Sequence, residues 1–308
     1  PVMTVGQLPL DLVQQASRWS AEHGLKDSES HHLLSVVGIL QQQNLVIPEG
    51  NVVCEEYIDN GAFGSIYKAK YNDLPVAVKK IDDGSSANLS DFVDVVFSEL
   101  LAVSSLKHPN IVRFMGMVFQ VPSSARLDQS LDCAFVFEFC ELGNMSDNIF
   151  GLHRVLGHWD DRLRVSSDVA QGIDYIHSCG FIHRDINMRN VVIHSDLSAK
   201  ICDFGTARRL SSDGTFDPDF VEGTPPAMSP EQLRGAVLRA SSDVYQLGVL
   251  LWECFAMLRA WEDVVADPTD LEAFQRLILK ERRSLPPLPP GRGLPAPVHA
   301  ALAGLCEA

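Results

Sequence analysis

The side chains best suited to chemistry lie in the stretch His183-Arg184-Asp185-Ile186-Asn187-Met188-Arg189-Asn190 and in the turn Asp203-Phe204-Gly205 that follows it. These stretches supply carboxylate and amide oxygens, which are the ligands that Mg²⁺ prefers in proteins. Such groups suit phosphoryl transfer, because in that reaction the protein mainly positions the reactants, holds metal ions and stabilises developing charge. A pattern of so many fixed residue types at fixed spacing rarely arises by chance.

This pattern resembles the catalytic loop and the metal-binding turn of the eukaryotic protein kinases. The resemblance implies that Asp185 accepts the proton of the acceptor hydroxyl and that Asn190 and Asp203 supply oxygen ligands to Mg²⁺. It also implies ATP and Mg²⁺ as cofactors and proteins as substrates. An aspartate in a loop can instead merely cap a turn, but that alternative does not explain the complete pattern.

A glycine-containing stretch, Ile58 to Tyr67, resembles the hairpin that covers the nucleotide phosphates in the same family. Asp59 stands where the family has its first glycine, so a carboxylate is expected near the polyphosphate. Taken alone, the stretch is equally compatible with a plain hairpin turn. The ATP-binding positions that the resemblance implies here are Ile58, Gly61, Phe63, Gly64 and Ile66.

Lys79 ends the apolar run Val76-Ala77-Val78, which predicts a buried strand. By resemblance, Ala77 and Lys79 belong to the ATP-binding set, and Glu99 is the ion-pair partner of Lys79. A strand-end lysine and a solvated surface glutamate are the simpler alternatives. A helix around Glu99 is predicted, because apolar residues follow with helical spacing at Leu100, Val103 and Leu106.

The segment Ala134 to Gly143 resembles the hinge of the family. Phe137 would be the gatekeeper, and the backbone of Glu138 and Cys140 would hydrogen-bond adenine. Val192 completes the ATP-binding positions that the resemblance implies. The alternative is an ordinary edge strand.

The residues from Asp203 to Glu231 resemble an activation segment. Arg184 precedes the catalytic aspartate, as it does in kinases whose activation loop is ordered by phosphate. Our hypothesis is that phosphorylation of the loop creates an arginine–phosphate pair that orders the segment. The candidate phosphorylation sites are Ser211, Ser212 and Thr215.

Two further acids are expected to have structural roles in the large lobe. Asp243 matches the buried aspartate that begins a long central helix and anchors the catalytic loop by hydrogen bonds. Glu231 closes the motif Ser229-Pro230-Glu231, in which Ser229 replaces the family's alanine. The family's final arginine, the partner of this glutamate, has no candidate, so Glu231 is expected to lack a partner.

The resemblance implies an α+β fold with two lobes. We expect a helical extension over residues 1–50, with helices near Leu10–His23 and His31–Gln43, and a kinase domain over 51–308. The small lobe, about 51–137, would hold a five-stranded antiparallel sheet and one helix. A hinge over 138–143 and a mainly helical large lobe over 144–308 would follow, with a loop near Leu285–Pro297 and a helix near Ala301–Glu307. The chain is expected to stop before the family's last helix and to be a piece of a longer multidomain protein.

Composition excludes some classes of partner. The chain has 25 basic and 40 acidic side chains and a net charge of −15, which disfavours nucleic acid as a partner. No apolar run is long enough to predict a membrane span. Seven cysteines without a C-x-x-C pair indicate free thiols and therefore a cytoplasmic, intracellular location.

The motifs leave the acceptor to be decided. Thr224 after Gly223 is typical of serine/threonine kinases, in which this threonine contacts the catalytic loop. Asn187 replaces their usual lysine, and Arg189 stands where tyrosine-directed families often have arginine. The mixture most resembles the tyrosine-kinase-like group, which implies serine/threonine phosphorylation.

The sequence leaves three alternatives to a serine/threonine kinase. Asp59, Asn187 and Ser229 motivate a pseudokinase or scaffold, and a dual-specificity, tyrosine-capable kinase is the other alternative within the fold. A small-molecule phosphotransferase is disfavoured by the activation segment, which serves peptide binding.

Overall fold

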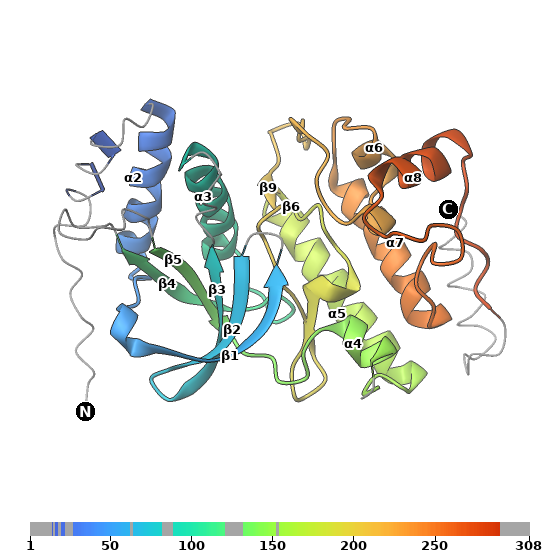
Figure 1. The fold of residues 1–308 in the computed structure, drawn as a ribbon, viewed down its shortest axis with the longest axis horizontal. Helices are drawn as coiled ribbons and strands as arrows, with labels where there is room; N and C mark the ends of the chain where they lie inside the picture. Colours follow the sequence, from blue (N-terminus) through green and yellow to red (C-terminus); the bar gives the residue numbers. More distant parts are fainter. Residues whose placement is uncertain are drawn as a thin grey trace. The chain divides into compact units, whose positions relative to one another are not determined.

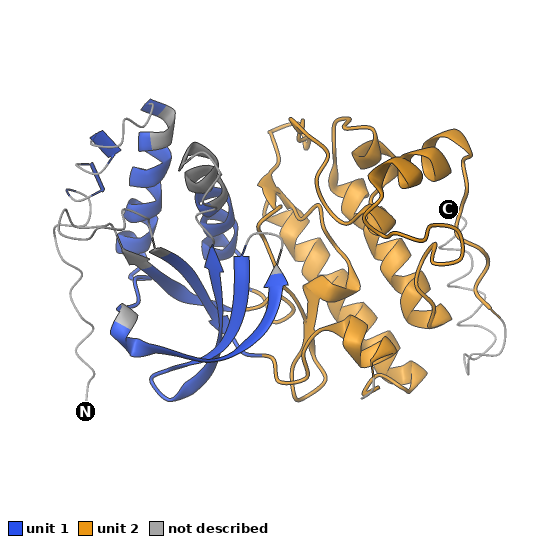
Figure 2. Cartoon of the chain, viewed as in Figure 1, with its two compact units in different colours: residues 1–107, 113–139 blue, residues 108–112, 140–308 orange. Residues whose placement is uncertain are grey.

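The computed structural model describes residues 14, 16–17, 20–21, 27–61, 64–81, 89–120, 132–151 and 154–289. The chain divides into two compact units (Figure 2): unit 1 comprises residues 1–107 and 113–139, and unit 2 comprises residues 108–112 and 140–308. Three predicted features lie wholly or largely outside the described residues: the helix near Leu10–His23, the second half of the loop near Leu285–Pro297 and the helix near Ala301–Glu307.

Unit 1 contains the predicted five-stranded antiparallel sheet, in the order β1-β2-β3-β5-β4 (Figure 1). Asn72 and Asp73 connect β2 to β3 in a two-residue turn, and both have positive φ, 51° and 63°. Asparagine and aspartate tolerate this backbone better than most residues, and such turns match the twist of paired strands. The strands are β1 (Val52–Gly61), β2 (Gly64–Tyr71), β3 (Leu74–Ile81), β4 (Phe114–Gln120) and β5 (Asp132–Glu138).

One face of this sheet forms a core of small and branched side chains. Because successive strand residues point to opposite faces, Val76 and Val78 of β3 share this face, and each is at most 1% exposed. Branched side chains pack well on a pleated surface, which is why these segments form strands. The other members of the cluster are Ile47, Ala69, Val118, Ala134 and Val136.

Besides the sheet, the described part of unit 1 contains α2 (Asp27–Gln42), the 3-10 turn η1 (Glu49–Asn51) and α3 (Leu89–Ser105). Helix α2 has an apolar stripe in which Leu33, Val37 and Leu40 are at most 2% exposed. Helix α2 packs against α3, and the two lie side by side in Figure 1. The second predicted N-terminal helix is therefore present as α2 and packs within unit 1.

Unit 2 is mainly helical. Its two long helices, α5 (Trp159–Ser178) and α7 (Ala240–Ala256), pack against each other, and α5 also packs against β8. Short strands form two antiparallel pairs: β6 (Phe181–Ile182) pairs with β9 (Arg208–Arg209), and β7 (Val191–Ile193) forms a hairpin with β8 (Ala199–Ile201). The remaining elements are α4 (Met145–Phe150), η2 (Met188–Asn190), η3 (Pro225–Ala227), α6 (Pro230–Leu233), α8 (Leu271–Phe274) and the π-helical turn η4 (Gln275–Lys280).

Within the described part of the chain, no helix has both the length and the apolar content that a bilayer crossing requires.

Candidate active site

The centre of the candidate site in unit 1 is a buried ion pair. Lys79 Nζ lies 2.8 Å from Glu99 Oε1 and 2.9 Å from Oε2, so the expected pair is present. The side chains are 5% and 0% exposed, respectively. Lys79 is on β3, between β2 and β5 in the sheet, and Glu99 is on the predicted helix, α3. Burial makes each charge dependent on the other, because an unpaired charge in this position would be strongly destabilising.

The glycine-containing stretch is the β1–β2 hairpin. Gly61 pairs with Gly64 at its end, and Ile66 pairs with both Asp59 and Lys79 on the neighbouring strands. Gly64 has φ of 144°, and a Cβ there would lie 1.8 Å from the Lys80 carbonyl oxygen. Only glycine fits at this position.

Asp59, which stands where the family has its first glycine, makes a hydrogen bond within the hairpin. Asp59 Oδ1 accepts the backbone N–H of Asn60 at 2.8 Å, so this carboxylate is partly used within its own turn. Ile58, at the bulge beside Asp59, is 47% exposed. Phe63 lies outside the described residues, so its predicted ATP contact stays a prediction.

The predicted hinge begins at the end of β5. Because β5 lies between β3 and β4, the edge-strand alternative is wrong. Phe137 pairs with Ala77, is 8% exposed, and has its ring centroid 5.6 Å from that of Phe114. Glu138 is fixed by a backbone N–H bond to the Arg113 carbonyl at 3.0 Å and by its carboxylate, which accepts the Arg113 N–H at 2.7 Å.

Two of the expected ATP-binding residues belong to unit 2. Cys140 is 7% exposed, and its carbonyl accepts the N–H of Gly143 at 3.2 Å. Val192 is the middle residue of β7, where it pairs with Lys200 of β8 and forms a bridge to Asn144.

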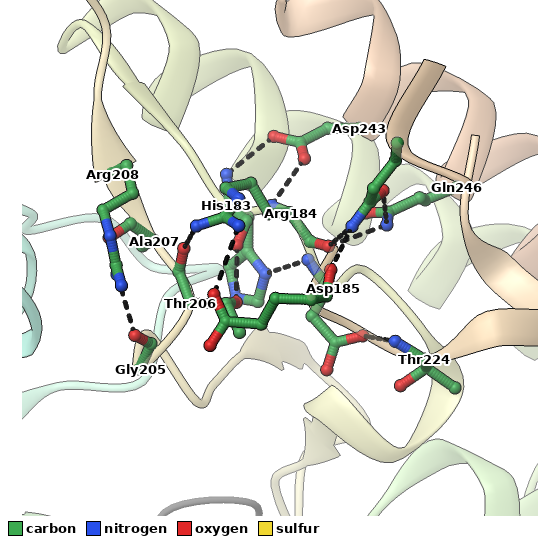
Figure 3. Close-up of polar contacts among 12 residues, drawn as sticks. His183, Arg184, Asp185, Gly205, Thr206, Ala207, Arg208, Thr224, Asp243 and Gln246 are labelled. Atoms are coloured by element: carbon green, nitrogen blue, oxygen red, sulfur yellow. Dashed lines mark hydrogen bonds and ion pairs between the residues drawn. The ribbon is translucent and has the colours of Figure 1, made fainter. Parts of the chain in front are cut away.

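The candidate catalytic carboxylate of unit 2 is held at both oxygens. Asn190 Nδ2 donates to Asp185 Oδ2 at 2.8 Å and to the Asp185 carbonyl at 2.9 Å. The backbone N–H of Thr224 donates to Asp185 Oδ1 at 2.9 Å (Figure 3). A carboxylate that accepts from two directions has a fixed orientation, as a proton acceptor in a reaction requires.

A hairpin places the candidate metal ligands at the same end of two paired strands. Val191 pairs with Ile201, so Asn190 and Cys202 flank the same end of the β7–β8 hairpin. The Cys202 N–H donates to the Asn190 carbonyl at 2.9 Å, and Asp203 follows directly. Asp203 has φ of 59°, an uncommon conformation for a residue other than glycine. Such strained backbone clusters at functional sites.

The donor set fits Mg²⁺. Asn190 donates its amide nitrogen to Asp185, so its amide oxygen remains the ligand atom, and Asp203 offers a carboxylate. Mg²⁺ is commonly held by one or two carboxylates together with substrate phosphates and water. Among the described residues, no group of three or more His, Cys, Asp or Glu side chains could hold a metal.

The expected anchor of the catalytic loop is confirmed. Asp243, at the start of α7, accepts the backbone N–H groups of His183 at 2.9 Å and Arg184 at 2.8 Å, as the dashed lines in Figure 3 show. His177 Nε2 lies 2.8 Å from the same carboxylate. Phe204, which follows the candidate metal ligand Asp203, is 1% exposed and meets the His183 ring edge-on at 5.0 Å between centroids.

Two buried glutamines support the same loop, and sequence reasoning missed both. Gln246 accepts the Ile186 N–H at 2.8 Å and donates to the Arg184 carbonyl at 2.9 Å. Gln232 donates to that carbonyl at 2.8 Å. For Gln246, the available signal was an amide one helical turn after Asp243 in the predicted central helix.

Asn187 is built into the loop rather than left at its surface. Its Oδ1 accepts the N–H groups of Arg189 at 2.9 Å and Asn190 at 3.3 Å, so it caps the turn that carries Asn190. Its Nδ2 donates to Thr224 Oγ1 at 3.2 Å. The expected contact between Thr224 and the catalytic loop is therefore present.

Arg184 has a carboxylate partner already. Its Nη2 lies 3.2 Å from Glu222 Oε2, its Nη1 donates to the Thr206 carbonyl at 3.1 Å, and its guanidinium lies 4.8 Å from the Phe216 ring centroid. Arg184 is 2% exposed. Burial lowers the pKa of Arg184, while the Glu222 carboxylate opposes this shift.

The proposed phosphorylation sites form a separate turn. Ser211 Oγ donates to Asp213 Oδ1 at 2.5 Å, and Thr215 Oγ1 donates to the same oxygen at 2.7 Å. These two hydrogen bonds lower the pKa of Asp213. Ser212, between them, is exposed. The structure thus gives Arg184 the partner Glu222 and gives Ser211 and Thr215 the partner Asp213.

The expectation that Glu231 lacks a partner is wrong. Ser242 Oγ donates to Glu231 Oε1 at 2.7 Å. Ser242 is the third residue of α7, next to the loop anchor Asp243, so a residue close in space but eleven positions away in the chain satisfies the carboxylate.

Comparison with known proteins agrees with the motifs. The model of the family described as protein tyrosine and serine/threonine kinase matches residues 52–286. A probable serine/threonine-protein kinase of Arabidopsis thaliana, SIS8, is 34% identical over 210 residues, 67% of this chain and 19% of that protein. The serine/threonine-protein kinase CTR1 of the same plant is 30% identical over 228 residues, 72% of this chain and 26% of that protein.

A third relative is the dual specificity protein kinase shkC of Dictyostelium discoideum, 31% identical over 241 residues, 76% of this chain and 44% of that protein. The chain therefore spans between 19% and 44% of the length of these three relatives. The matched region includes every catalytic, metal-binding and ATP-binding position that the motifs predicted, and the chain belongs to the protein tyrosine and serine/threonine kinase family.

Proposed function

We propose that this chain transfers the terminal phosphate of ATP to serine and threonine hydroxyl groups of protein substrates. The observation that carries the proposal is the geometry of Asp185, whose two carboxylate oxygens accept hydrogen bonds from Asn190 and Thr224. The same carboxylate would orient the acceptor hydroxyl and receive its proton. Lys79 and Glu99 would form the phosphate-pairing ion pair.

ATP and Mg²⁺ are the proposed cofactors. Asn190 and Asp203 would hold the metal, which when bound offsets the charge of the nucleotide phosphates. The full ATP-binding set that we propose is Ile58, Gly61, Phe63, Gly64, Ile66, Ala77, Lys79, Phe137, Glu138, Cys140 and Val192.

Serine and threonine are the proposed acceptors because of the link between Asn187 and Thr224, a threonine that is typical of serine/threonine kinases. Two of the three relatives above carry serine/threonine-protein kinase in their names, while the third is named as dual specificity. Tyrosine-capable activity is therefore the second candidate.

The three residues that motivate the pseudokinase or scaffold alternative each make a local hydrogen bond. Asp59 accepts a backbone N–H of its own hairpin, Asn187 caps the turn before Asn190, and Ser229 caps α6 by accepting the Gln232 N–H at 3.3 Å. Each departure from the family pattern thus has a local structural use. These contacts support an intact site rather than a degraded one.

Three further proposals concern the location of the protein, its full length and its domain boundaries. Among the described cysteines, Cys54, Cys179 and Cys254 are free thiols, which supports a cytoplasmic location. The greater length of the relatives supports the proposal that the chain is part of a longer multidomain protein. Residues 1–50 as an extension, 51–137 as small lobe, 138–143 as hinge and 144–308 as large lobe remain our proposed domain boundaries.

Phosphoamino-acid analysis tests the proposed acceptor. The protein is incubated with radiolabelled ATP, Mg²⁺ and generic protein substrates, and the labelled residues are separated after acid hydrolysis. We expect label on serine and threonine, and none from the Asp185→Asn variant. Label on tyrosine as well would favour the dual-specificity alternative, and no label from folded wild-type protein would contradict the proposal.

A further inference from the structure

The N-terminal helix α2 lies against the helix that carries Glu99, and no catalytic motif accounts for it. Phe97, two positions before Glu99, stacks on His32 of α2 with ring centroids 4.6 Å apart and an interplanar angle of 8°. The buried stripe of α2 faces a helix whose own Val96 and Leu100 are at most 2% exposed. Helix α2 is therefore a packing partner of α3 along the turn that bears the ion pair.

The segment after α2 ties it to the sheet. The Met117 N–H donates to the Leu45 carbonyl at 2.7 Å, and the Ile47 N–H donates to the Met117 carbonyl at 2.8 Å. Because β4 is an edge strand, this segment covers its otherwise unpaired side. Helix α2 is thus fixed at its C-terminal end to the same sheet that holds Lys79.

The sequence of β4 fits this close approach. Gly116 has φ of 147°, and a Cβ at this position would lie 2.5 Å from the Leu45 carbonyl oxygen. It would also lie 2.9 Å from the Ile47 side chain. Glycine therefore allows the segment to reach the strand.

We propose that α2 is a positioning element for phosphoryl transfer, which holds α3 where Glu99 pairs with Lys79. His32 is its key positioning residue, because its ring stacks on Phe97, two positions before Glu99 in the chain. Lys79 and Glu99 are 5% and 0% exposed, so a displaced α3 would leave both charges buried without each other. The inference rests on the proposed role of this ion pair in the reaction.

The test compares substitutions at two neighbouring histidines. His32→Ala removes the ring that stacks on Phe97, while His32→Phe keeps an aromatic ring. His31→Ala is the matched control, because His31 is exposed and lies one position away. We expect His32→Ala to lower kcat/KM by about three- to tenfold and His32→Phe to restore most of it, with His31→Ala unchanged.

A double-mutant cycle separates positioning from general destabilisation. In a Glu99→Gln background, His32→Ala should cause no further loss of kcat/KM, because the interaction through which it acts is already absent. Equal losses in both backgrounds would overturn the inference. If Glu99→Gln alone leaves activity unchanged, the proposed role of the ion pair fails instead.

Amide hydrogen exchange gives a readout that does not depend on activity. We expect His32→Ala to speed exchange in the α3 segment from Val96 to Ser105, whereas His31→Ala leaves it as in wild type. Unchanged exchange in α3, together with unchanged kcat/KM, would show that α2 does not hold this helix.

Discussion

Single residues of the candidate site differ in how well they are fixed. Asp185 is fixed through both carboxylate oxygens, and its neighbour Arg184 through a carboxylate, a carbonyl and an aromatic ring. The positive φ of Arg184, 72°, adds local strain that these contacts must hold. Arg184 thus has a defined position in the catalytic loop.

A substitution at Glu222 tests whether the functional partner of Arg184 is a carboxylate or a phosphate. The sequence-based hypothesis assigns Arg184 a phosphate from Ser211, Ser212 or Thr215, whereas the structure pairs it with Glu222 at 3.2 Å. We expect Glu222→Gln to lower both kinase activity and melting temperature, because it leaves a buried guanidinium without that carboxylate.

The matched comparison is the triple variant with alanine at Ser211, Ser212 and Thr215, assayed after phosphatase treatment. We expect it to retain wild-type activity. If the triple variant is inactive and Glu222→Gln is unaffected, phosphate rather than Glu222 is the functional partner of Arg184, as the sequence-based hypothesis states.

At this scale, the sequence predicted the residues that belong to contiguous motifs. Asp185, Asn190 and Asp203 were recognised because their residue types and spacing resemble the motifs of a known family. Gln246 and Glu222 were missed, because hydrogen bonds between residues far apart in the chain leave no periodic signal. The Glu231 prediction was wrong for the same reason, since its partner Ser242 is not adjacent in sequence.

Helix α7 carries residues that hold the catalytic loop and also a buried acid, Glu253, whose ionised form is unfavourable. Its N-terminal half carries Asp243 and Gln246, which bind the loop. Its C-terminal half carries Glu253, whose Oε1 accepts the Ala260 N–H at 2.9 Å. Burial raises the pKa of Glu253, and the Ala260 hydrogen bond only partly opposes the shift.

Glu253 therefore gives a prediction about pH. A raised pKa means that the folded state binds the proton more tightly than the unfolded state, so stability falls as pH rises from the ordinary carboxyl pKa through the folded one. We expect Glu253→Gln to raise the melting temperature at neutral pH, because glutamine keeps an acceptor for Ala260 without a buried charge. The difference should vanish below the ordinary carboxyl pKa.

Thermal melts from pH 4 to pH 8 check this expectation. Asp219→Asn, which changes an exposed acid, is the matched control. A melting-temperature difference between wild type and Glu253→Gln that stays constant with pH would contradict the assignment.

Elements with a clear pattern of apolar residues were predicted. The strand that carries Lys79 was read from an apolar run, and the helix around Glu99 was read from helical spacing. What α2 packs against could not be predicted, because periodicity reports that a face is buried but not its partner. The close approach of Leu45 to Gly116 could not be predicted from the sequence either, because a glycine in a strand has several explanations.

On the scale of the whole molecule, the chain divides into one sheet-based unit and one helical unit. Their motif order predicted this α+β division, because each motif belongs to a known element of the kinase fold. Each unit holds a part of the proposed site. The Lys79–Glu99 pair lies in unit 1, and Asp185, Asn190 and Asp203 lie in unit 2.

We propose that the oriented Asp185 carboxylate acts in the phosphoryl-transfer step and not in nucleotide binding. A single-turnover measurement separates the two, with wild type, Asp185→Asn and the control Asp174→Asn, which changes an exposed acid on α5. We predict that Asp185→Asn slows transfer from ATP and Mg²⁺ to a protein substrate by at least about a hundredfold, while ATP affinity stays near wild type. Transfer by Asp185→Asn at the wild-type rate would contradict the account.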